Sequence, residues 1–317
     1  MTNTPTKLSV AFYNLENLFD IIDDEDTLDN DFLPSSDKKW TKKRYENKLR
    51  KLSFAISNIG LEDIGKTLAL MGFAEVENKK VIEDLLDAKH LKELPYDYVH
   101  YDSPDERGID VGLIYDTTQF SLTASETFTV NLYDDEGKRD FTRDILLVTG
   151  ILDNNLVHII VNHWPSRRKG SQETEHKRLI ASKKVEEIIE LIKSKEEHPR
   201  ILIMGDFNDG PSDKSVQNLT QNQSLYNPMA ILKSRNRGSL SYRLEWNLFD
   251  QILISTNFFE RDTLNYESAH IFDVDFLKLF NGKYKGIPYR TYVGKKYKGG
   301  YSDHFPVYII LENNLKI

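Results

Sequence analysis

The chain has 317 residues, of which 39% are hydrophobic and 11% aromatic, so it is long enough to bury one large core. Its 50 acidic and 42 basic residues give a formal net charge of −8. This charge argues against a protein that binds nucleic acid mainly through its overall electrostatic field, so any phosphate must be recognised by local groups. The absence of cysteine excludes disulfides, thiolate metal sites and cysteine nucleophiles.

No linker-like or low-complexity stretch divides the chain. We therefore expect a single catalytic domain over residues 1–317. The sequence contains no apolar run of about 18 residues and no apolar segment near its start that resembles a secretory signal. We therefore expect a cytoplasmic protein without stable membrane association.

Short apolar runs predict buried strands along the whole chain, at residues 8–13, 68–73, 111–115, 145–152, 157–161, 201–204, 252–254 and 307–311. An apolar stripe with steps of three and four residues predicts a helix from Tyr45 to Ile59, and residues 171–195 show the same period. Near-continuous apolar strands need cover on both faces, so the pattern predicts packed sheets with helices outside.

Polar clusters follow several of these strands. Asp206 and Asn208 lie two residues apart after the strand at 201–204, a spacing that points both side chains the same way in an extended segment. They can then hold one water or one phosphoryl oxygen. Asn14 and Glu16 repeat the spacing after the first strand, and an ordinary polar turn is the alternative at both places.

Two further clusters suggest metal and acid–base chemistry. Glu75 follows an apolar run, where it is either a solvated side chain or a ligand, and oxygen ligands without cysteine suit Mg²⁺ or Mn²⁺. In the Asp303–His304 pair, the carboxylate can anchor a metal while the imidazole stabilises or protonates a phosphate oxygen.

His163 is either a structural histidine at a strand end or part of a phosphate site. The second interpretation is favoured by Arg167, Arg168 and Lys169, because a guanidinium fork matches phosphate oxygens. Asp250 enters an apolar strand, where a carboxylate is costly to bury without a partner, and a histidine would supply one.

Taken in order, these motifs resemble the endonuclease/exonuclease/phosphatase superfamily, which is deoxyribonuclease I-like. The set comprises Asn14-Leu15-Glu16, Glu75, Asn162-His163, Gly205-Asp206-Phe207-Asn208, Asp250 and Ser302-Asp303-His304, and runs from about residue 8 to residue 312. The resemblance implies a four-layered α/β/β/α sandwich and a divalent-metal-dependent phosphoesterase.

The resemblance also implies roles at the matching positions. Glu75 is then the principal ligand of Mg²⁺ or Mn²⁺, with Asn14, Glu16 and Asp303 around the ion. Ala74 stands where the family usually has glutamine before this glutamate.

The implied catalytic residues are His163, Asp206, Asn208, Asp250 and His304. Asp206 orients or deprotonates the attacking water with help from Asn208. His304, oriented by Asp250, stabilises the transition state. His163 holds a phosphate oxygen where abasic-site enzymes use tyrosine, which favours the deoxyribonuclease and sphingomyelinase side of the family.

Substrate recognition has several interpretations. The stretches 139–143 and 289–298 interleave cations and rings, which suits a nucleic-acid strand, although a solvated loop with structural tyrosines fits equally well. The first hypothesis is a monomeric nuclease that cleaves phosphodiester bonds of DNA or RNA and has no named protein partner. Its substrate-binding candidates are Arg107, Arg143, Arg167, Arg168 and Tyr301.

The second hypothesis is a phosphatase or phospholipase-like esterase that acts on inositol phosphates or phospholipids. Phe276 and Phe280 would then form a membrane-touching ridge, although a short core-packed helix is the preferred interpretation of residues 272–280. The third hypothesis is a non-catalytic binding module. The full set of metal and acid–base residues argues against it. The acidic segment 23–31 lacks the glycine and terminal glutamate of a calcium loop, so we expect a solvated loop there.

Overall fold

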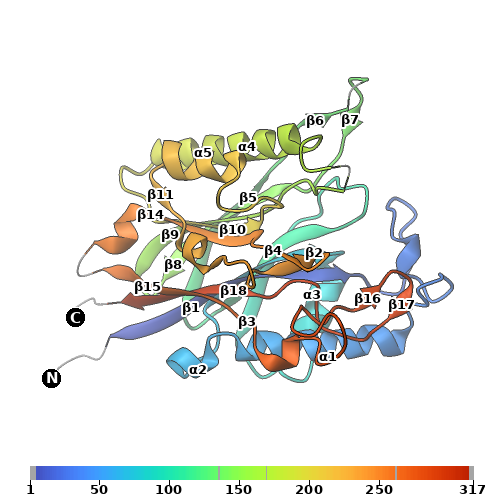
Figure 1. The fold of residues 1–317 in the computed structure, drawn as a ribbon. Helices are drawn as coiled ribbons and strands as arrows, with labels where there is room; N and C mark the ends of the chain where they lie inside the picture. The colour runs from blue at the N-terminus through green and yellow to red at the C-terminus, as the bar shows by residue number, and fades with distance from the viewer. Residues whose placement is uncertain (1–4, 135, 169, 261–262, 314–317) are drawn as a thin grey trace.

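Two six-stranded sheets lie face to face, with helices on both outer faces, in the computed structural model of the chain (Figure 1). The structure describes residues 5–134, 136–168, 170–260 and 263–313. Figure 1 shows four layers in succession, namely α4 and α5, the second sheet, the first sheet, and α1 with α2 and α3. The predicted α/β/β/α sandwich is confirmed.

The first sheet contains both ends of the chain's regular structure. Its strands, in spatial order, are β15 (Leu264–Ile271), β18 (Val307–Asn313), β1 (Thr6–Leu18), β2 (Leu70–Val76), β4 (Asp110–Asp116) and β3 (Tyr96–His100). The helices of its outer layer are α1 (Lys42–Asn58), α2 (Leu61–Ile64) and α3 (Lys79–Leu86).

The second sheet contains the middle of the chain. Its strands, in spatial order, are β11 (Leu225–Tyr226), β14 (Asp250–Ser255), β10 (Ile201–Asp206), β9 (Asn155–His163), β8 (Ile145–Leu152) and β5 (Phe120–Phe128). The helices on its outer face are α4 (Glu175–Lys193) and α5 (Lys214–Asn222).

Three small hairpins extend from the loops. They pair β6 (Leu132–Tyr133) with β7 (Arg139–Asp140), β12 (Leu240–Tyr242) with β13 (Glu245–Asn247), and β16 (Tyr292–Val293) with β17 (Lys296–Tyr297). Short 3₁₀ segments occur at Asn30–Phe32, Pro228–Leu232, Thr256–Phe259 and Asp275–Leu277. The acidic segment 23–31 forms bends and turns, as expected of a solvated loop, although Asp29 within it is buried.

Seven of the eight predicted strands lie within strands of the two sheets, and the eighth, 68–73, overlaps β2, which begins at Leu70. The predicted helices correspond to α1 and α4. Of the strands in the two large sheets, β3, β5, β11 and β15 were not predicted. Most residues of β5 are exposed, as suits a strand at the edge of the second sheet, so it has no continuous apolar run. The strands β3 and β15 are mostly half-buried and equally lack one.

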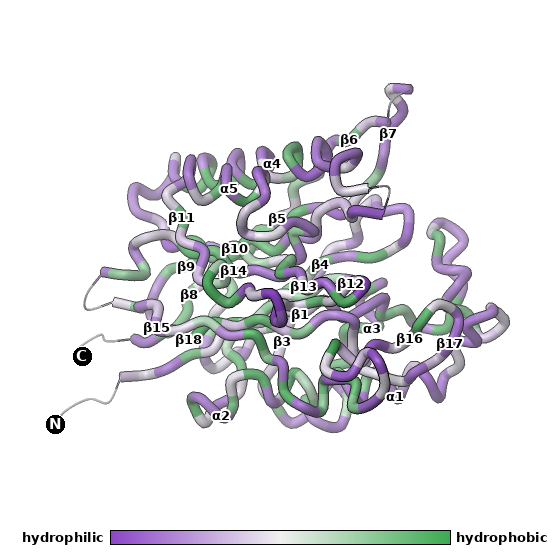
Figure 2. The backbone as a smooth tube through the Cα atoms, viewed as in Figure 1, coloured by the Kyte–Doolittle hydropathy of each residue, from purple (hydrophilic) through white to green (hydrophobic). Residues whose placement is uncertain are grey.

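Apolar side chains fill the space between the sheets and the space beneath each helical layer. Figure 2 shows the apolar strands in the interior, with more hydrophilic segments toward the outer helices and loops. The two sheets approach closely where Gly72 faces Met204, because a Cβ atom at Gly72 would lie 2.5 Å from the Met204 sulfur. The helix α1 packs Leu49, Leu52 and Ile56 inward, as its apolar stripe predicts.

Strand direction brings several predicted site residues to one edge of the sandwich. The strands β1 and β2 are parallel, and so are β9 and β10, so their carboxyl ends meet at the same edge within each sheet. Asp206 pairs with His163 on one side and with Asp250 of the antiparallel β14 on the other. Asn14 pairs with Ala74, next to Glu75.

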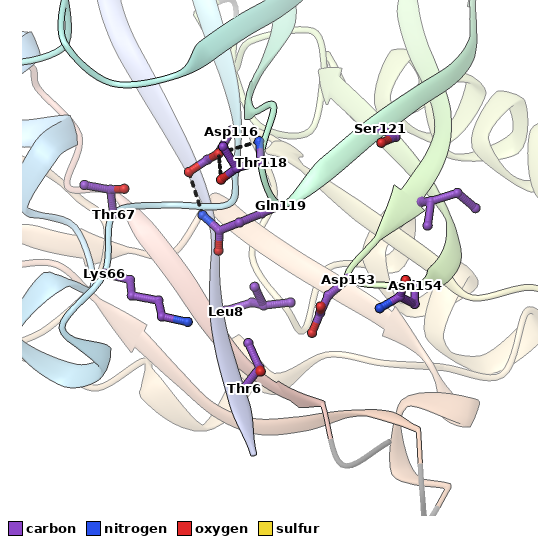
Figure 3. Close-up of a pocket in the computed structure, with 11 residues that line it drawn as sticks. Thr6, Leu8, Lys66, Thr67, Asp116, Thr118, Gln119, Ser121, Asp153 and Asn154 are labelled. Carbon is purple, nitrogen blue, oxygen red and sulfur yellow. Dashed lines mark hydrogen bonds between the residues drawn. The ribbon is translucent and has the colours of Figure 1, made fainter. Parts of the chain in front are cut away.

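A cavity of about 590 Å³ lies at the opposite end of β1, beside Thr6 and Leu8 (Figure 3). In its wall, the Asp116 carboxylate accepts hydrogen bonds from the Thr118 hydroxyl and the Gln119 amide. The cavity contains none of the predicted site residues.

The segment 272–280 is partly as expected. The ring of Phe276 packs against those of Phe54, Phe272 and Tyr301, whereas Phe280 is 68% exposed. Within the described ranges, no helix is both long enough and apolar enough to cross a bilayer.

Replacement of Gly205 by alanine should destabilise the fold. A Cβ atom there would lie 2.1 Å from the Asn162 carbonyl oxygen of the neighbouring strand, and this oxygen belongs to paired backbone that cannot easily shift. We expect Gly205→Ala to lower the free energy of unfolding by about 3 kcal/mol, as measured by urea denaturation.

Gly210→Ala is the control, because a Cβ atom at Gly210 meets no atom closer than 3.6 Å. We expect it to change the free energy of unfolding by less than about 1 kcal/mol. Equal stability of the two variants would contradict the proposed close contact between β9 and β10.

Candidate active site

The predicted site residues converge from six strands of two sheets. Asn14 and Glu16 lie near the end of β1, and Glu75 lies near the end of β2. In the second sheet, His163 ends β9, Asp206 ends β10 and Asp250 begins β14. Asp303 and His304 precede β18. Most of these side chains are buried, while Glu75 and Asp303 remain partly accessible.

Irregular backbone geometry sets the direction of several of these side chains. Glu16, Asn17, Glu75 and Asn208 all have positive φ angles, between 48° and 64°, which are uncommon for residues other than glycine. The pairing register also shifts between Asn14 and Leu18 and between Ala74 and Val76. Such bulges and strained positions re-aim side chains at strand ends and concentrate at functional sites.

Asp206 is at the centre of the cluster. Its Oδ2 accepts a hydrogen bond from the Asn14 amide at 3.1 Å, and its Oδ1 accepts one from the Asn208 backbone N–H at 2.9 Å. The Nε2 atoms of His163 and His304 lie 3.7 and 3.9 Å from Oδ2. Burial, and next the charge of Asp250, raise the pKa of Asp206 to about 7. A carboxylate with this pKa suits general-base chemistry near neutral pH.

His304 and Asp250 form a buried pair, with 2.7 Å between Nδ1 and the Asp250 Oδ2. Burial opposes protonation of this histidine, but the carboxylates of Asp250, Asp206 and Asp303 together outweigh burial and raise the pKa of His304 well above its ordinary value. The Ser302 hydroxyl accepts from the His304 backbone N–H and donates to the Asn14 carbonyl, which ties the segment to β1. The imidazolium therefore presents Nε2 toward Asp206.

His163 has the opposite electrostatic setting. Burial and then the positive charges of Arg143 and Arg107 lower its pKa well below the ordinary value, so the ring is neutral at pH 7. Its Nδ1 is buried and has no hydrogen-bond partner among the described residues. A neutral imidazole in this position is available to one oxygen of a bound anion.

Oxygen donors suited to a divalent metal lie beside this cluster. The Glu75 Oε2 accepts from the Asn17 N–H at 2.9 Å, which leaves Oε1 facing Arg107 at 3.8 Å. The Asn14 Oδ1 and one oxygen of Asp303 lie on the same edge. A set of carboxylate and amide oxygens without thiolates fits Mg²⁺ or Mn²⁺. The ligand atoms of Asp206, Asp250 and His304 also lie within 4.8 Å of one another.

Glu16 is surrounded by donors from the protein itself. The Glu16 Oε2 accepts from the Thr291 N–H at 2.6 Å and lies 3.7 Å from the Lys48 ammonium, while Oε1 lies 3.3 Å from the Arg290 Nε. Arg290 also donates to the Asp303 Oδ2 at 2.7 Å. Burial lowers the pKa of Lys48 to about 8, so it remains largely charged at pH 7.

The substrate-binding candidates differ in how far they are engaged. Arg143 is buried and donates to the Asp105 carboxylate and the Trp164 carbonyl. Arg167 donates to the Asn208 carbonyl and to the carboxylates of Asp209 and Asp213.

The remaining candidates differ in exposure. Arg107 donates to the Asn17 side chain. Arg168 is exposed, and Lys169 lies outside the described residues. Tyr301 is half-buried beneath the Lys51 ammonium. Substrate contact by these side chains stays a prediction.

The sequence did not single out Lys48, Arg290 or Trp164. Lys48 lies inside an ordinary amphipathic helix, and Arg290 belongs to a basic stretch that suggested a surface rim. The Trp164 carbonyl accepts from Arg143 and Asn208, and only the tertiary structure reveals such a backbone contact.

Comparison with solved structures supports the fold. An endonuclease/exonuclease/phosphatase family protein from Bacteroides thetaiotaomicron is 16% identical with a TM-score of 0.62, over 98% of this chain and 96% of that one. A mannosyl-6-phosphatase from the same organism is 15% identical, with a TM-score of 0.58 and coverage of 96% and 99%. TDP2 from D. rerio, solved with a single-strand DNA product, is 14% identical, with a TM-score of 0.58 and coverage of 96% and 98%.

A search of curated proteins returned no match. The model of the Endonuclease/Exonuclease/phosphatase family matches residues 9–313, which is nearly the whole chain. Proteins of this superfamily are generally hydrolases of phosphoester bonds and depend on divalent metals. The chain therefore belongs to the Endonuclease/Exonuclease/phosphatase family.

Proposed function

We propose that this protein is a divalent-metal-dependent nuclease that hydrolyses phosphodiester bonds of DNA or RNA. The observation that carries the proposal is the position of Asp206, which lies within 4 Å of both His163 and His304 and beside the oxygen donors of Asn14, Glu75 and Asp303. Phosphoester hydrolysis needs a base for water, a proton or charge donor for the phosphoryl oxygens, and a cation. The cluster contains candidates for each.

In the proposed reaction, Asp206 accepts a proton from the attacking water at one of its carboxylate oxygens. The bonds from the Asn14 amide and the Asn208 N–H hold that carboxylate in place. His304, held by Asp250 through Nδ1, donates from Nε2 to a phosphoryl oxygen as negative charge develops there. The neutral His163 binds a second phosphoryl oxygen.

The metal is assigned to Glu75, Asp303 and Asn14. When bound, a divalent ion neutralises negative charge on the phosphoryl oxygens and on the leaving oxygen. Glu75 and Asp303 are the partly accessible carboxylates of the cluster, so both would be open to an ion that enters from solvent. Asn17 orients Glu75 through its backbone N–H.

A projecting arm favours an extended nucleic-acid substrate. The hairpin of β6 and β7 extends beyond the body of the sandwich (Figure 1). Tyr133 and Phe141 on this arm are 57% and 44% exposed, and the Arg139 guanidinium lies 5.6 Å from each ring centre. Arg143, two residues beyond Phe141, reaches the Trp164 carbonyl next to His163. Exposed rings and a cation along one path suit base stacking and phosphate contact.

A phosphatase that acts on small phosphomonoesters is the alternative. Arg143, Arg167 and Arg290 are paired with carboxylates of the protein, which reduces the positive charge available to a polyanionic strand. The fold likeness to a mannosyl-6-phosphatase is compatible with this alternative. Pairing of these three guanidinium groups therefore suits a small phosphomonoester better than a long strand.

Loss of either acid–base group should abolish most activity. We expect Asp206→Asn and His304→Ala to lower kcat by about 10² to 10⁴-fold each, because each removes a proton-transfer or charge-stabilising group. The measurement is the steady-state hydrolysis of bis(p-nitrophenyl) phosphate with Mn²⁺, and circular dichroism checks the fold.

His270→Ala is the matched control, since it removes a half-buried imidazole of β15 that stacks on Tyr308 of β18. It should leave kcat within about twofold. Wild-type turnover by folded Asp206→Asn or His304→Ala would overturn the assignment of that residue.

Glu75→Gln should weaken metal binding, because an amide keeps the shape of the carboxylate and loses its charge. We expect the Kd for Mn²⁺, measured by electron paramagnetic resonance of the free ion, to rise at least about tenfold. Glu77→Gln is the control, because burial raises the pKa of Glu77 to about 8 and the amide resembles its protonated form. An unchanged Kd in Glu75→Gln would remove Glu75 from the metal site.

Product release from a substrate panel tests the substrate class. The panel is supercoiled plasmid, single-stranded RNA, bis(p-nitrophenyl) phosphate and an inositol polyphosphate, each with Mg²⁺, Mn²⁺ or EDTA. We expect metal-dependent plasmid or RNA cleavage that His304→Ala abolishes. Turnover of the inositol phosphate alone would reject the nuclease and support the phosphatase. No turnover of any substrate would reject both the nuclease and the phosphatase for the substrates of this panel.

A further inference from the structure

A second cavity, of about 640 Å³, lies between the acidic segment 23–31 and the projecting arm. It is lined by residues 26–28 of the acidic segment, by residues 103–106 and by Phe141, which follows β7 on the arm. Its volume falls within the range of about 300–1,000 Å³ that is typical of small-molecule sites. The acidic segment, which takes no part in the proposed reaction, thus forms one side of a cavity.

Backbone contacts hold the acidic segment against the opposite wall. The Leu28 N–H donates to the Glu106 carbonyl at 2.8 Å. A Cβ atom at Gly108, where φ is 65°, would lie 2.8 Å from the Thr27 Cβ, so only glycine allows the two segments to meet this closely. The cavity therefore lies between loops that are fixed relative to each other.

The buried Asp105 connects this cavity to the active site. Its Oδ1 accepts from the Arg107 backbone N–H and its Oδ2 from the Arg143 guanidinium, both at 3.0 Å. The Arg107 guanidinium lies 3.8 Å from the Glu75 Oε1, and Arg143 also donates to the carbonyl of the residue that follows His163. A ligand in the cavity would therefore lie one arginine side chain away from the proposed metal site and another away from His163.

The walls combine apolar surface with hydrogen-bond acceptors. Phe141 and Leu28 are 44% and 65% exposed, so part of a ring and an aliphatic side chain are accessible. Asp26 and Glu106 are exposed, and neither carboxylate forms an ion pair within the described part of the chain. Because carboxylates accept hydrogen bonds and repel phosphate, the walls favour a flat apolar group that carries hydrogen-bond donors.

We propose that this cavity binds the nucleobase next to the scissile phosphate and prefers bases that carry an amino group. This inference rests on the nuclease activity of the proposed function. The base packs against Phe141, and its amino group donates to the carboxylate of Asp26 or Glu106. Uracil and thymine have no amino group and turn carbonyl oxygens toward these carboxylates. The phosphate stays outside the cavity, on the side of Arg107 and Arg143.

The test compares dinucleoside monophosphates, each of which has one scissile phosphate and two bases. Adenine or cytosine replaces uracil, or thymine in the deoxyribose series, on one side of the phosphate at a time. Methyl p-nitrophenyl phosphate measures hydrolysis without a base, and Mn²⁺ is present throughout. We expect kcat/KM to rise about tenfold when one of the two positions carries adenine or cytosine, because a hydrogen bond to a charged acceptor is made only then.

Two variants separate stacking from amino-group recognition. Phe141→Ala should raise KM for the preferred dinucleotides at least about fivefold and leave kcat within about twofold, because base stacking is lost and the reacting groups are intact. Phe141→Tyr retains a ring and should retain the wild-type KM. Asp26→Asn combined with Glu106→Gln should lower the preference for amino-bearing bases to less than about threefold, since an amide can also donate to a carbonyl oxygen.

Matched controls lie at the other end of the sandwich. Phe259→Ala removes a ring that is 51% exposed and follows the end of β14 opposite Asp250. Glu93→Gln combined with Glu197→Gln removes two carboxylates that are 83% and 92% exposed. Both controls should retain the base preference and KM of the wild type. No variant should change kcat/KM for methyl p-nitrophenyl phosphate by more than about twofold.

Several outcomes would overturn the inference. Cleavage of all dinucleotides with equal kcat/KM would reject base recognition and leave the nuclease in place. An unchanged KM in Phe141→Ala, or a full preference after loss of both carboxylates, would show that the cavity does not hold the base. Faster turnover of p-nitrophenyl phosphorylcholine, lost in Phe141→Ala, would assign the cavity to a quaternary ammonium group instead. No turnover of any ester would reject the proposed function together with this inference.

Discussion

Compensation of buried negative charge is the constraint on which this site depends. Five carboxylates gather at one edge of the sandwich, and a carboxylate removed from water is stable only with a paired charge or several hydrogen bonds. The chain meets this demand separately for each group. Asp250 has His304, Glu16 has Lys48 and Arg290, and Asp206 has backbone and amide donors. Burial and next the charge of Asp250 raise the pKa of Asp206, and against the effect of burial the surrounding carboxylates raise that of His304.

The sandwich makes the site rigid, and the departures from regular strand geometry set the directions of the site side chains. Regular pairing alone would place side chains on alternating faces of each sheet. The bulges after Asn14 and Ala74, with left-handed backbone at Glu16 and Glu75, interrupt this alternation where the site residues meet. Because such conformations cost about 1–3 kcal/mol each, the well-packed strands on either side have to support them.

The sequence was sufficient to predict the layers and which candidate site residues come together, for identifiable reasons. Buried strands such as β10 are short apolar runs, and the residues that follow them carry the polar motifs. Edge strands such as β5 carry no such run, because one face is open to water. Lys48 could not be recognised, since a lysine in an amphipathic helix is ordinarily solvated and only its contact with Glu16 reveals another role. The engagement of Arg143 and Arg167 likewise depends on contacts across the fold.

The pairing of β1 with β18 has a consequence for biosynthesis. Thr6 lies opposite Asn313, and the two strands occupy the middle of the first sheet, between β15 and β2. During translation, one edge of β1 therefore waits unpaired until β18 has left the ribosome. Loop closure over so long a separation is slow, and an apolar strand with an open edge is prone to intermolecular pairing. The nascent chain is thus most exposed to aggregation just before its last strand arrives, when a chaperone would have the greatest effect on yield.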